Sequence, residues 1–166
     1  MVVIIFGVSG VGKTTIGKLL ARDLGWRFLE ADDFHPAANI EKMRNGQPLT
    51  DEDREPWLKK LRDAIKRSLD ANENAVLACS ALKKKYRDKL RVNADVKFVF
   101  LRAGQERVAK QLKNRPGHFF DSKLLDNQFA DLEAPTSVKD ALTVEVAGEP
   151  REVVSKIEAI LPEPGR

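Results

Sequence analysis

A run of glycines followed by lysine and threonine is the clearest chemical signal in this sequence. The run is Gly7-Val8-Ser9-Gly10-Val11-Gly12-Lys13-Thr14, which matches the pattern G-x-x-x-x-G-K-[ST] at every position. Glycines in such a loop let several backbone N–H groups point at one phosphate. Lys13 would reach the β- and γ-phosphates of a nucleotide, and the Thr14 hydroxyl would ligate Mg²⁺. The sequence therefore predicts a nucleotide-binding loop.

The loop alone does not identify a reaction, because GTPase switches carry the same pattern. Such switches usually add an N/T-K-x-D motif that reads guanine, and this sequence has none. The strand predicted at residues 75–79 also lacks an acid at its end, since it runs into Ser80. These absences disfavour a GTPase switch and leave a purine triphosphate as the expected nucleotide. The residues expected to bind it are Gly7, Val8, Ser9, Gly10, Val11, Gly12, Lys13, Thr14 and Thr15.

Acidic residues follow the second predicted strand, in the segment Glu30-Ala31-Asp32-Asp33-Phe34-His35-Pro36. In a doubly wound sheet, ligands bind beyond the carboxyl ends of the strands. A carboxylate there could orient the hydroxyl of a phosphate acceptor and take its proton late in the reaction. We expect Asp32 to be this catalytic acid–base group. The alternative for these acids is an aspartate-rich turn with a helix cap, and His35 is either a ligand contact or a plain loop residue.

Basic residues follow the third predicted strand. Lys83 and Arg87 lie four residues apart, which puts them on one face if the segment is helical. Such a face suits a carboxylate or a phosphate, and its alternative is a solvated basic surface.

Arg115 precedes Pro116-Gly117 in a segment that favours a bend. An arginine that closes over a reaction can stabilise charge on the transferred phosphoryl group, whereas a surface arginine is the simpler alternative.

The elements that must position these residues follow an alternating pattern. Short apolar runs indicate strands and periodic apolar positions indicate amphipathic helices, a combination typical of a parallel α/β sheet. The predicted strands are residues 2–6, 27–30, 75–79, 97–101 and 142–146. The predicted helices are residues 13–24, 56–69 and 150–161. Thr50 and Asp53 resemble a capping box at the start of the second of these helices, with Asp in place of the usual Glu.

Length and composition indicate one globular domain. The chain has 166 residues, of which 42% are hydrophobic and 33% charged. Two stretches without the alternating pattern divide it into a core of residues 1–31, 75–113 and 132–166, an insertion of residues 32–74, and a lid of residues 114–131. The net charge of +4 suits an anionic small molecule and does not by itself exclude nucleic acid.

The sequence indicates a cytoplasmic protein that needs no membrane partner. One cysteine, Cys79, cannot form an internal disulfide, which favours a reducing compartment. The chain shows no signal peptide, and its apolar runs fall well short of the roughly 20 residues that span a bilayer. The one tyrosine and eight phenylalanines show no spacing typical of base stacking, so no nucleic-acid partner is expected.

Several segments together resemble gluconokinase of the short P-loop type. They are residues 7–14, 32–36, 39–43, 49–57 and 79–88, and Gly117-His118-Phe119-Phe120. The resemblance covers nearly the whole chain. It implies an α/β P-loop NTPase fold in three layers, similar to nucleoside monophosphate and shikimate kinases, with a five-stranded parallel sheet, a helical substrate-binding insertion and a lid. It implies transfer of the ATP γ-phosphate to the 6-hydroxyl of D-gluconate with Mg²⁺, by an enzyme that forms homodimers.

The resemblance also implies roles for individual residues. Lys13, Asp32 and Arg115 would be catalytic, and Thr14 would hold Mg²⁺. Substrate binding is implied for Asp32, His35, Lys42, Arg54, Lys83, Arg87 and His118. Two positions depart from the pattern: Gln111 replaces a common arginine, and Asn127 replaces a common hydroxyl residue before Gln128-Phe129.

Two other functions fit part of the sequence. One is another small-metabolite kinase, for example of the shikimate type. The other is a non-catalytic, nucleotide-dependent binding module that uses the basic surface to contact RNA. Release of ADP with a panel of sugar acids separates the first from a gluconokinase, and salt-dependent RNA binding without turnover would indicate the second.

Overall fold

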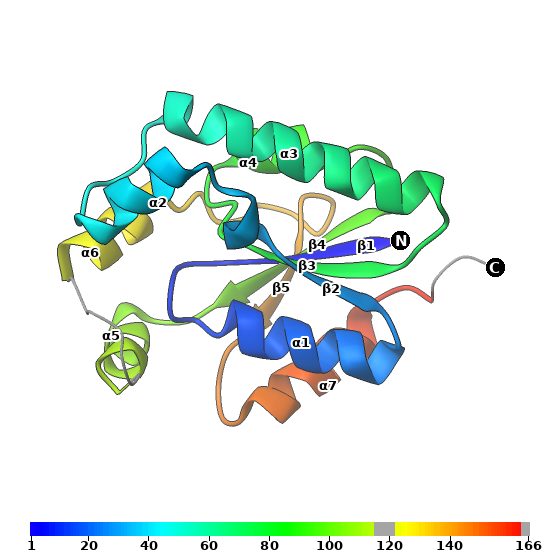
Figure 1. Ribbon diagram of the computed structural model, residues 1–166. Helices are drawn as coiled ribbons and strands as arrows, with labels where there is room; N and C mark the ends of the chain where they lie inside the picture. The colour runs from blue at the N-terminus through cyan, green and yellow to red at the C-terminus, as the bar shows by residue number, and fades with distance from the viewer. Residues whose placement is uncertain (115–121, 164–166) are drawn as a thin grey trace.

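The computed structural model describes residues 1–114 and 122–163, which form one parallel sheet covered by helices (Figure 1). In the described residues the sheet has five strands in the order β2-β3-β1-β4-β5, all parallel. The strands are β1 Val2–Phe6, β2 Arg27–Glu30, β3 Ala75–Cys79, β4 Val96–Arg102 and β5 Leu142–Glu145. This arrangement confirms the predicted α/β fold class.

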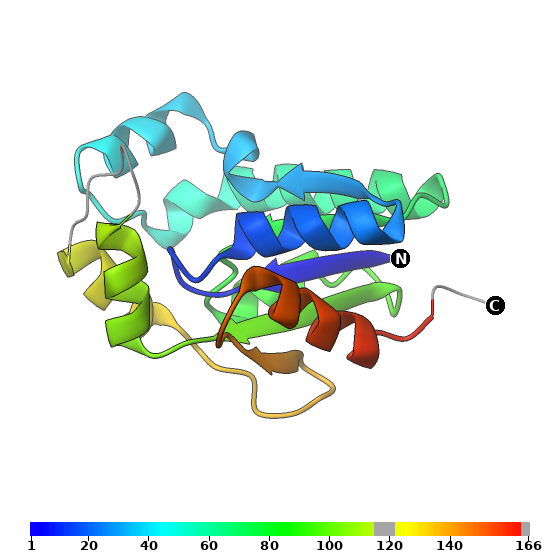
Figure 2. The same cartoon turned by 90° about the horizontal axis from the view of Figure 1, so that it is seen from below.

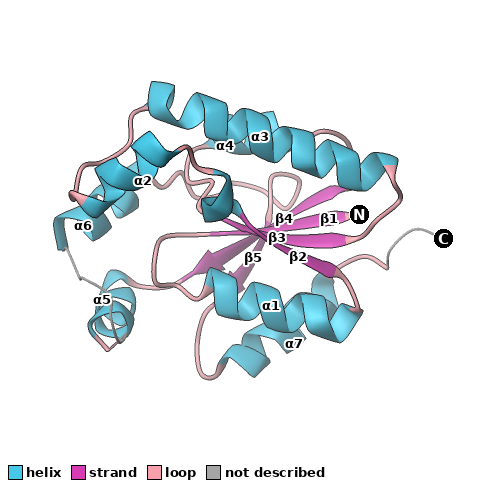
Figure 3. Ribbon diagram, in the orientation of Figure 1, coloured by secondary structure: helices cyan, strands magenta, loops and turns pink. Residues whose placement is uncertain are grey.

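Helices cover both faces of the sheet and make three layers (Figure 3). On one face lie α3 (Asp51–Asp70) and α4 (Lys84–Leu90), and on the other lie α1 (Lys13–Leu24) and α7 (Pro150–Ile160). Along β1, Val2, Ile4 and Phe6 pack in the cluster under α3 and α4, while Val3 and Ile5 pack in the cluster under α1 and α7. Burial on both faces explains why β1 is a continuous apolar run.

The remaining helices gather at the end of the sheet where the strands finish. They are η1 (Ala31–Phe34) and α2 (Ala37–Arg44) after β2, and α5 (Gln105–Lys113) and α6 (Ser122–Asp131) after β4. Figure 2 shows α2, α5 and α6 together at the end of the molecule that also holds the loop after β1. The carboxyl edge of the sheet is therefore the place where a ligand can meet all of these segments.

Most predicted elements occur within one residue of their predicted ends, but the insertion differs. Helix α3 begins at Asp51 rather than at Pro56, because Thr50 and Asp53 form a complete capping box. The Asp53 backbone N–H donates to Thr50 Oγ1 at 3.1 Å, and the Thr50 N–H donates to the Asp53 carboxylate at 2.9 Å. Helix α2 lies where the sequence predicted only a loop. It buries Asn39 alone, so no apolar stripe marks it.

Two further features bear on the sequence-based expectations. Cys79, at the end of β3, is a free and fully buried thiol within the core cluster under α3. Among the described residues, no helix is both long enough and apolar enough to cross a membrane. The loop predicted at residues 114–122 lies almost entirely outside the described residues.

Candidate active site

The glycine-rich loop joins β1, the central strand, to the start of α1. Gly10 and Gly12 have φ angles of 81° and 106°, a region that side chains rarely adopt. A Cβ atom on Gly10 would also lie 2.6 Å from Cγ of Leu112 on α5. The Lys13 ammonium donates to the carbonyl oxygens of Gly7 at 3.0 Å and Val8 at 2.9 Å. The loop thus has the curled form and the overlying cation that phosphate binding needs.

Thr14 and Glu30 place two oxygen ligands beside this loop. The Thr14 hydroxyl donates to Glu30 Oε2 at 2.5 Å, which joins the first turn of α1 to the end of β2. Burial raises the pKa of the Glu30 carboxyl, and the hydrogen bond from Thr14 opposes that rise. Mg²⁺ prefers such hard oxygen ligands and usually takes only one or two carboxylates plus substrate phosphates. Thr14 and Glu30 therefore fit a magnesium ion bound with a nucleotide.

Asp32 lies two residues beyond Glu30, in the short helix η1, and is exposed. Its side chain makes no hydrogen bond or ion pair within residues 1–114 and 122–163. Its negative charge acts on both neighbours, because it favours the protonated forms of Glu30 and His35. An accessible carboxylate at the carboxyl edge of the sheet can accept a proton from a bound hydroxyl.

His35 lies in the insertion, between η1 and α2. Its ring stacks on Trp57 of α3, with centroids 4.4 Å apart and an interplanar angle of 10°. The Trp57 indole N–H in turn donates to the Ala31 carbonyl oxygen at 2.7 Å. Lys42, on α2, forms an ion pair with Asp53 at 2.8 Å. The structure therefore brings His35 close to Asp32, while the Lys42 ammonium is engaged within the insertion.

Arg54 and Lys83 belong to a polar cluster that connects the starts of α3 and α4. Arg54 donates to the Tyr86 hydroxyl at 3.0 Å, and Lys83 donates to Asp51 at 3.2 Å. Tyr86 and Lys85 donate to the same Asp51 carboxylate. These donors hold the pKa of Asp51 well below its usual range, whereas burial and the Asp51 contact raise the pKa of Tyr86 to about 12. The two predicted substrate cations thus lie in one network.

Arg87 occupies a different environment from the one expected. It is 1% exposed, and its guanidinium donates to the carbonyl oxygens of Ala81, Leu82 and Glu133 at 2.8–3.0 Å. It also lies over the Phe6 ring, 4.7 Å from the centroid. Lys83 is the N-cap of α4 rather than part of it, so the predicted shared helix face does not form. The guanidinium of Arg87 therefore binds backbone carbonyl oxygens of the protein itself.

The sequence analysis missed one contact with the phosphate loop. The Ser9 backbone N–H donates to Gln128 Oε1 at 2.6 Å, and Gln128 Nε2 donates to Ser9 Oγ at 2.7 Å. These two bonds tie α6 to the loop across 119 residues of sequence. No local pattern marks such a contact. The other residues predicted for the lid, Arg115 and His118, lie outside the described residues.

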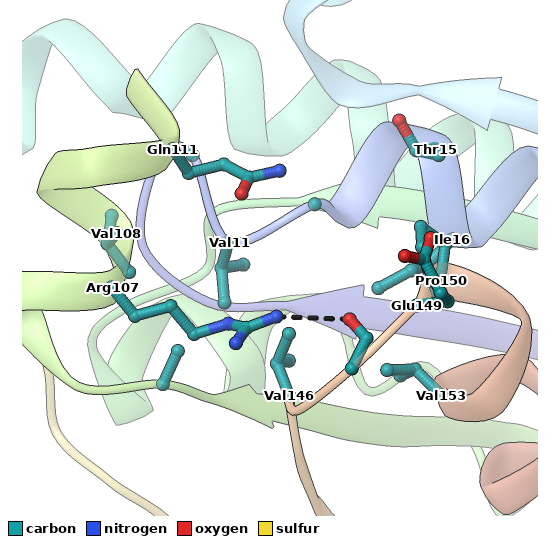
Figure 4. Close-up of a pocket in the computed structure, with 14 residues that line it drawn as sticks. Val11, Thr15, Ile16, Arg107, Val108, Gln111, Val146, Glu149, Pro150 and Val153 are labelled. Atoms are coloured by element: carbon teal, nitrogen blue, oxygen red, sulfur yellow. Dashed lines mark hydrogen bonds between the residues drawn. The ribbon is translucent and has the colours of Figure 1, made fainter. Parts of the chain in front are cut away.

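A cavity of ≈ 290 Å³ adjoins the phosphate loop on the side away from β2. Figure 4 shows that it is bounded by α1, by α5 and by the segment between β5 and α7. Arg107 of α5 donates to the Gly148 carbonyl oxygen at 3.1 Å and so closes one wall. Gln111 also lines the cavity. A nucleoside could fit here while its phosphates reach the glycine loop.

Comparisons with known proteins agree with this geometry. The family model for shikimate kinase matches residues 9–161. The gluconokinase of Gluconobacter oxydans is 46% identical over 147 residues, which is 88% of this chain and 82% of that protein. The thermoresistant gluconokinase of Escherichia coli is 42% identical, over 95% of this chain and 91% of that protein.

Solved structures give the same result. The crystal structure of a gluconokinase from Sinorhizobium meliloti has a TM-score of 0.84 and 42% identity, covering 95% of this chain and 89% of that one. A shikimate kinase from Aquifex aeolicus has a TM-score of 0.62 at 18% identity, over 96% of this chain and 94% of that one, and this likeness shows the fold alone.

Proposed function

This chain belongs to the gluconokinase family, within the wider shikimate kinase family, and from this premise we propose that it transfers the γ-phosphate of ATP to the 6-hydroxyl of D-gluconate. The products are 6-phospho-D-gluconate and ADP. The observation that carries the proposal is identity above 40% to gluconokinases along 95% of the chain, insertion included. Shikimate kinases share the fold at about half that identity or less.

The donor side of the reaction follows from the glycine loop. Backbone N–H groups of residues 7–14 would hold the phosphates, and Lys13 would offset their charge. Mg²⁺, when bound, neutralises charge on the β- and γ-phosphates. Thr14 and Glu30 are the residues that would hold it, because their oxygens already meet at the loop. The cavity beside Arg107 would take the adenosine.

The acceptor side would lie beside η1, within the insertion. We assign Asp32 to orient the 6-hydroxyl and to accept its proton. Arg54 and Lys83 would bind the carboxylate of gluconate. Both belong to the hydrogen-bond network around the Asp51 carboxylate, which supports binding of a second carboxylate there. His35 and Lys42 would contact the sugar hydroxyls, and Arg115 and His118 would complete the site from the lid.

The larger organisation is part of the same proposal. Residues 1–166 would act as one kinase domain with the core, insertion and lid divided as expected from the sequence. The location of η1, α2 and α3 between β2 and β3 supports the insertion. The hydrogen bond between Gln128 and Ser9 supports a lid that contacts the phosphate loop. We further infer a homodimer that works in the cytoplasm.

Release of ADP with a panel of acceptors tests the proposed function. Gluconate should support turnover, whereas glucose, which lacks the carboxylate, should have a kcat/KM lower by several orders of magnitude. Loss of a charge-assisted pair from a desolvated site costs on the order of 2–5 kcal/mol. Lys13→Met should abolish turnover and leave the fold intact. Preference for shikimate, or equal use of glucose, would refute the assignment.

A further inference from the structure

Asn39 of α2 has both hydrogens of its side-chain amide committed. It is 3% exposed, and Nδ2 lies 2.8 Å from the Asp53 backbone carbonyl oxygen and 3.2 Å from His35 Nδ1. A carbonyl oxygen can only accept, so the atom facing it must be the amide nitrogen. The orientation of the amide is therefore fixed by the Asp53 contact, independently of His35.

This orientation determines which nitrogen of His35 carries the proton. Because the Asn39 NH₂ group faces Nδ1, that nitrogen must accept and cannot bear a hydrogen. We infer that Asn39 is a positioning residue that holds His35 as the neutral imidazole with its proton on Nε2. The doubly protonated ring would set one N–H against another, so the same contact disfavours the cation.

The surroundings of the ring support the neutral form. Stacking on Trp57 fixes the ring plane, and the indole bond to the Ala31 carbonyl fixes Trp57. Burial lowers the pKa of His35, and the positive charge of Arg54 on α3 lowers it further. The Asp32 carboxylate on η1 opposes both effects. Lys42 of α2 is paired with Asp53. The net direction is toward a neutral histidine.

A fixed Nε2–H on His35, a ring that the charge of Asp32 reaches, has a consequence for acceptor binding, and this step rests on the proposed function. Nε2 makes no hydrogen bond to any residue in the described ranges 1–114 and 122–163. His35 then offers only a donor, and the neighbouring Asp32 carboxylate offers only acceptors. A sugar hydroxyl both donates and accepts, so this pair suits a polyhydroxylated acceptor. Asn39 would contribute to specificity without touching the substrate.

Long-range ¹H–¹⁵N correlation spectra of the ¹⁵N-labelled protein test the tautomer directly. The chain has two histidines, and His118→Gln assigns the signals. At neutral pH, His35 should show a protonated Nε2 and an unprotonated Nδ1, with and without gluconate. A protonated Nδ1, or a cation populated at neutral pH, would overturn the inference. The readout is independent of turnover, so an inactive protein would refute the proposed function and leave this result standing.

Variants of Asn39 extend the test. Asn39→Asp places an acceptor against Nδ1, so Nδ1 should become protonated and the KM for gluconate should rise about tenfold, as for loss of one hydrogen bond. The KM for ATP should stay unchanged. Asn45→Ala, at the exposed end of α2, is the matched control and should behave as wild type. If Asn39→Asp does not fold, the wild-type spectrum still decides. An unchanged tautomer in a folded Asn39→Asp variant would contradict the inference.

Discussion

The Thr14 hydroxyl donates a hydrogen bond to the Glu30 carboxylate at the phosphate loop. The negative charge of that carboxylate would attract a metal ion. Glu30→Gln keeps the size and a hydrogen-bonding group but removes the charge. The apparent affinity for Mg²⁺ should fall about 10–100-fold, as for changes around other metal sites. Titration of activity with Mg²⁺ measures this effect. Glu41→Gln on the exposed side of α2 should leave the titration unchanged, and an unchanged curve for Glu30→Gln would remove Glu30 from the metal site.

Asp32 provides a second test at the scale of a single residue. Asp32→Asn keeps the shape of the side chain but cannot take a proton, so kcat should fall by at least about 10²-fold. The melting temperature should hold, because Asp32 is exposed and unpaired within the described residues. Steady-state kinetics with gluconate as the varied substrate provide the measurement. A rise in KM with kcat intact would make Asp32 a binding residue instead of a base.

Single residues also show how far sequence reasoning reaches. The phosphate loop follows from spacing alone, because its chemistry is local. The burial of Arg87 could not be predicted, since a basic residue four positions from Lys83 looks the same in sequence whether it faces solvent or the core. The sequence does not identify Glu30 as a metal ligand, because only the fold shows that the end of β2 reaches Thr14. Buried partners such as Asn39 carry no motif.

At the scale of elements, α6 is joined to the phosphate loop by Gln128. Gln128→Leu keeps most of the volume but removes both hydrogen bonds to Ser9, so the KM for ATP should rise. Gln128→Glu should raise it further, because a carboxylate would repel the nucleotide phosphates at close range. Kinetics with ATP as the varied substrate compare the two. A smaller effect for Glu than for Leu would show that Gln128 lies away from the phosphates.

Arg87 connects the segment before α4 with the segment after α6. Arg87→Met removes the donors to three backbone carbonyl oxygens and the partner of the Asp140 carboxylate, so the free energy of unfolding should fall by about 3–5 kcal/mol. Chemical denaturation measures this change. Lys83→Met, four residues earlier and partly exposed, should instead weaken gluconate use and leave stability nearly constant. Equal stability of the two variants would contradict the structural role of Arg87.

The elements were predicted to different degrees, for physical reasons. Strands β1 and β3 are buried at every residue, so continuous apolar runs mark them. The edge strands β2 and β5 are only partly buried, and their place in the α/β alternation marks them instead. Helix α3 was found by its apolar stripe, but its first turn is set by the Thr50 cap rather than by periodicity. Helix α2 was missed because it is short and buries only Asn39. An element held by polar contacts leaves little trace in hydrophobic patterning.

At the scale of the whole molecule, the site exists only because parallel strands end at one edge. The loop after β1, the acids after β2, α6 and the segment after β5 meet there from distant parts of the chain. Both proposed substrates are anions, and the chain carries a net charge of +4. We expect kcat/KM for ATP to fall as ionic strength rises, because salt screens the attraction. Insensitivity to added salt would show that the net charge has no part in capture.

The burial of Cys79 has a practical consequence. It is the only cysteine in the chain, and burial raises the pKa of its thiol to about 12, so almost no thiolate forms at neutral pH. Maleimide dyes should therefore leave the folded wild-type protein unlabelled. Cysteines introduced at the exposed positions Ala38 and Asn127 would be the only reactive ones. A dye pair attached there would report energy transfer between α2 and α6 while the enzyme binds ATP and gluconate.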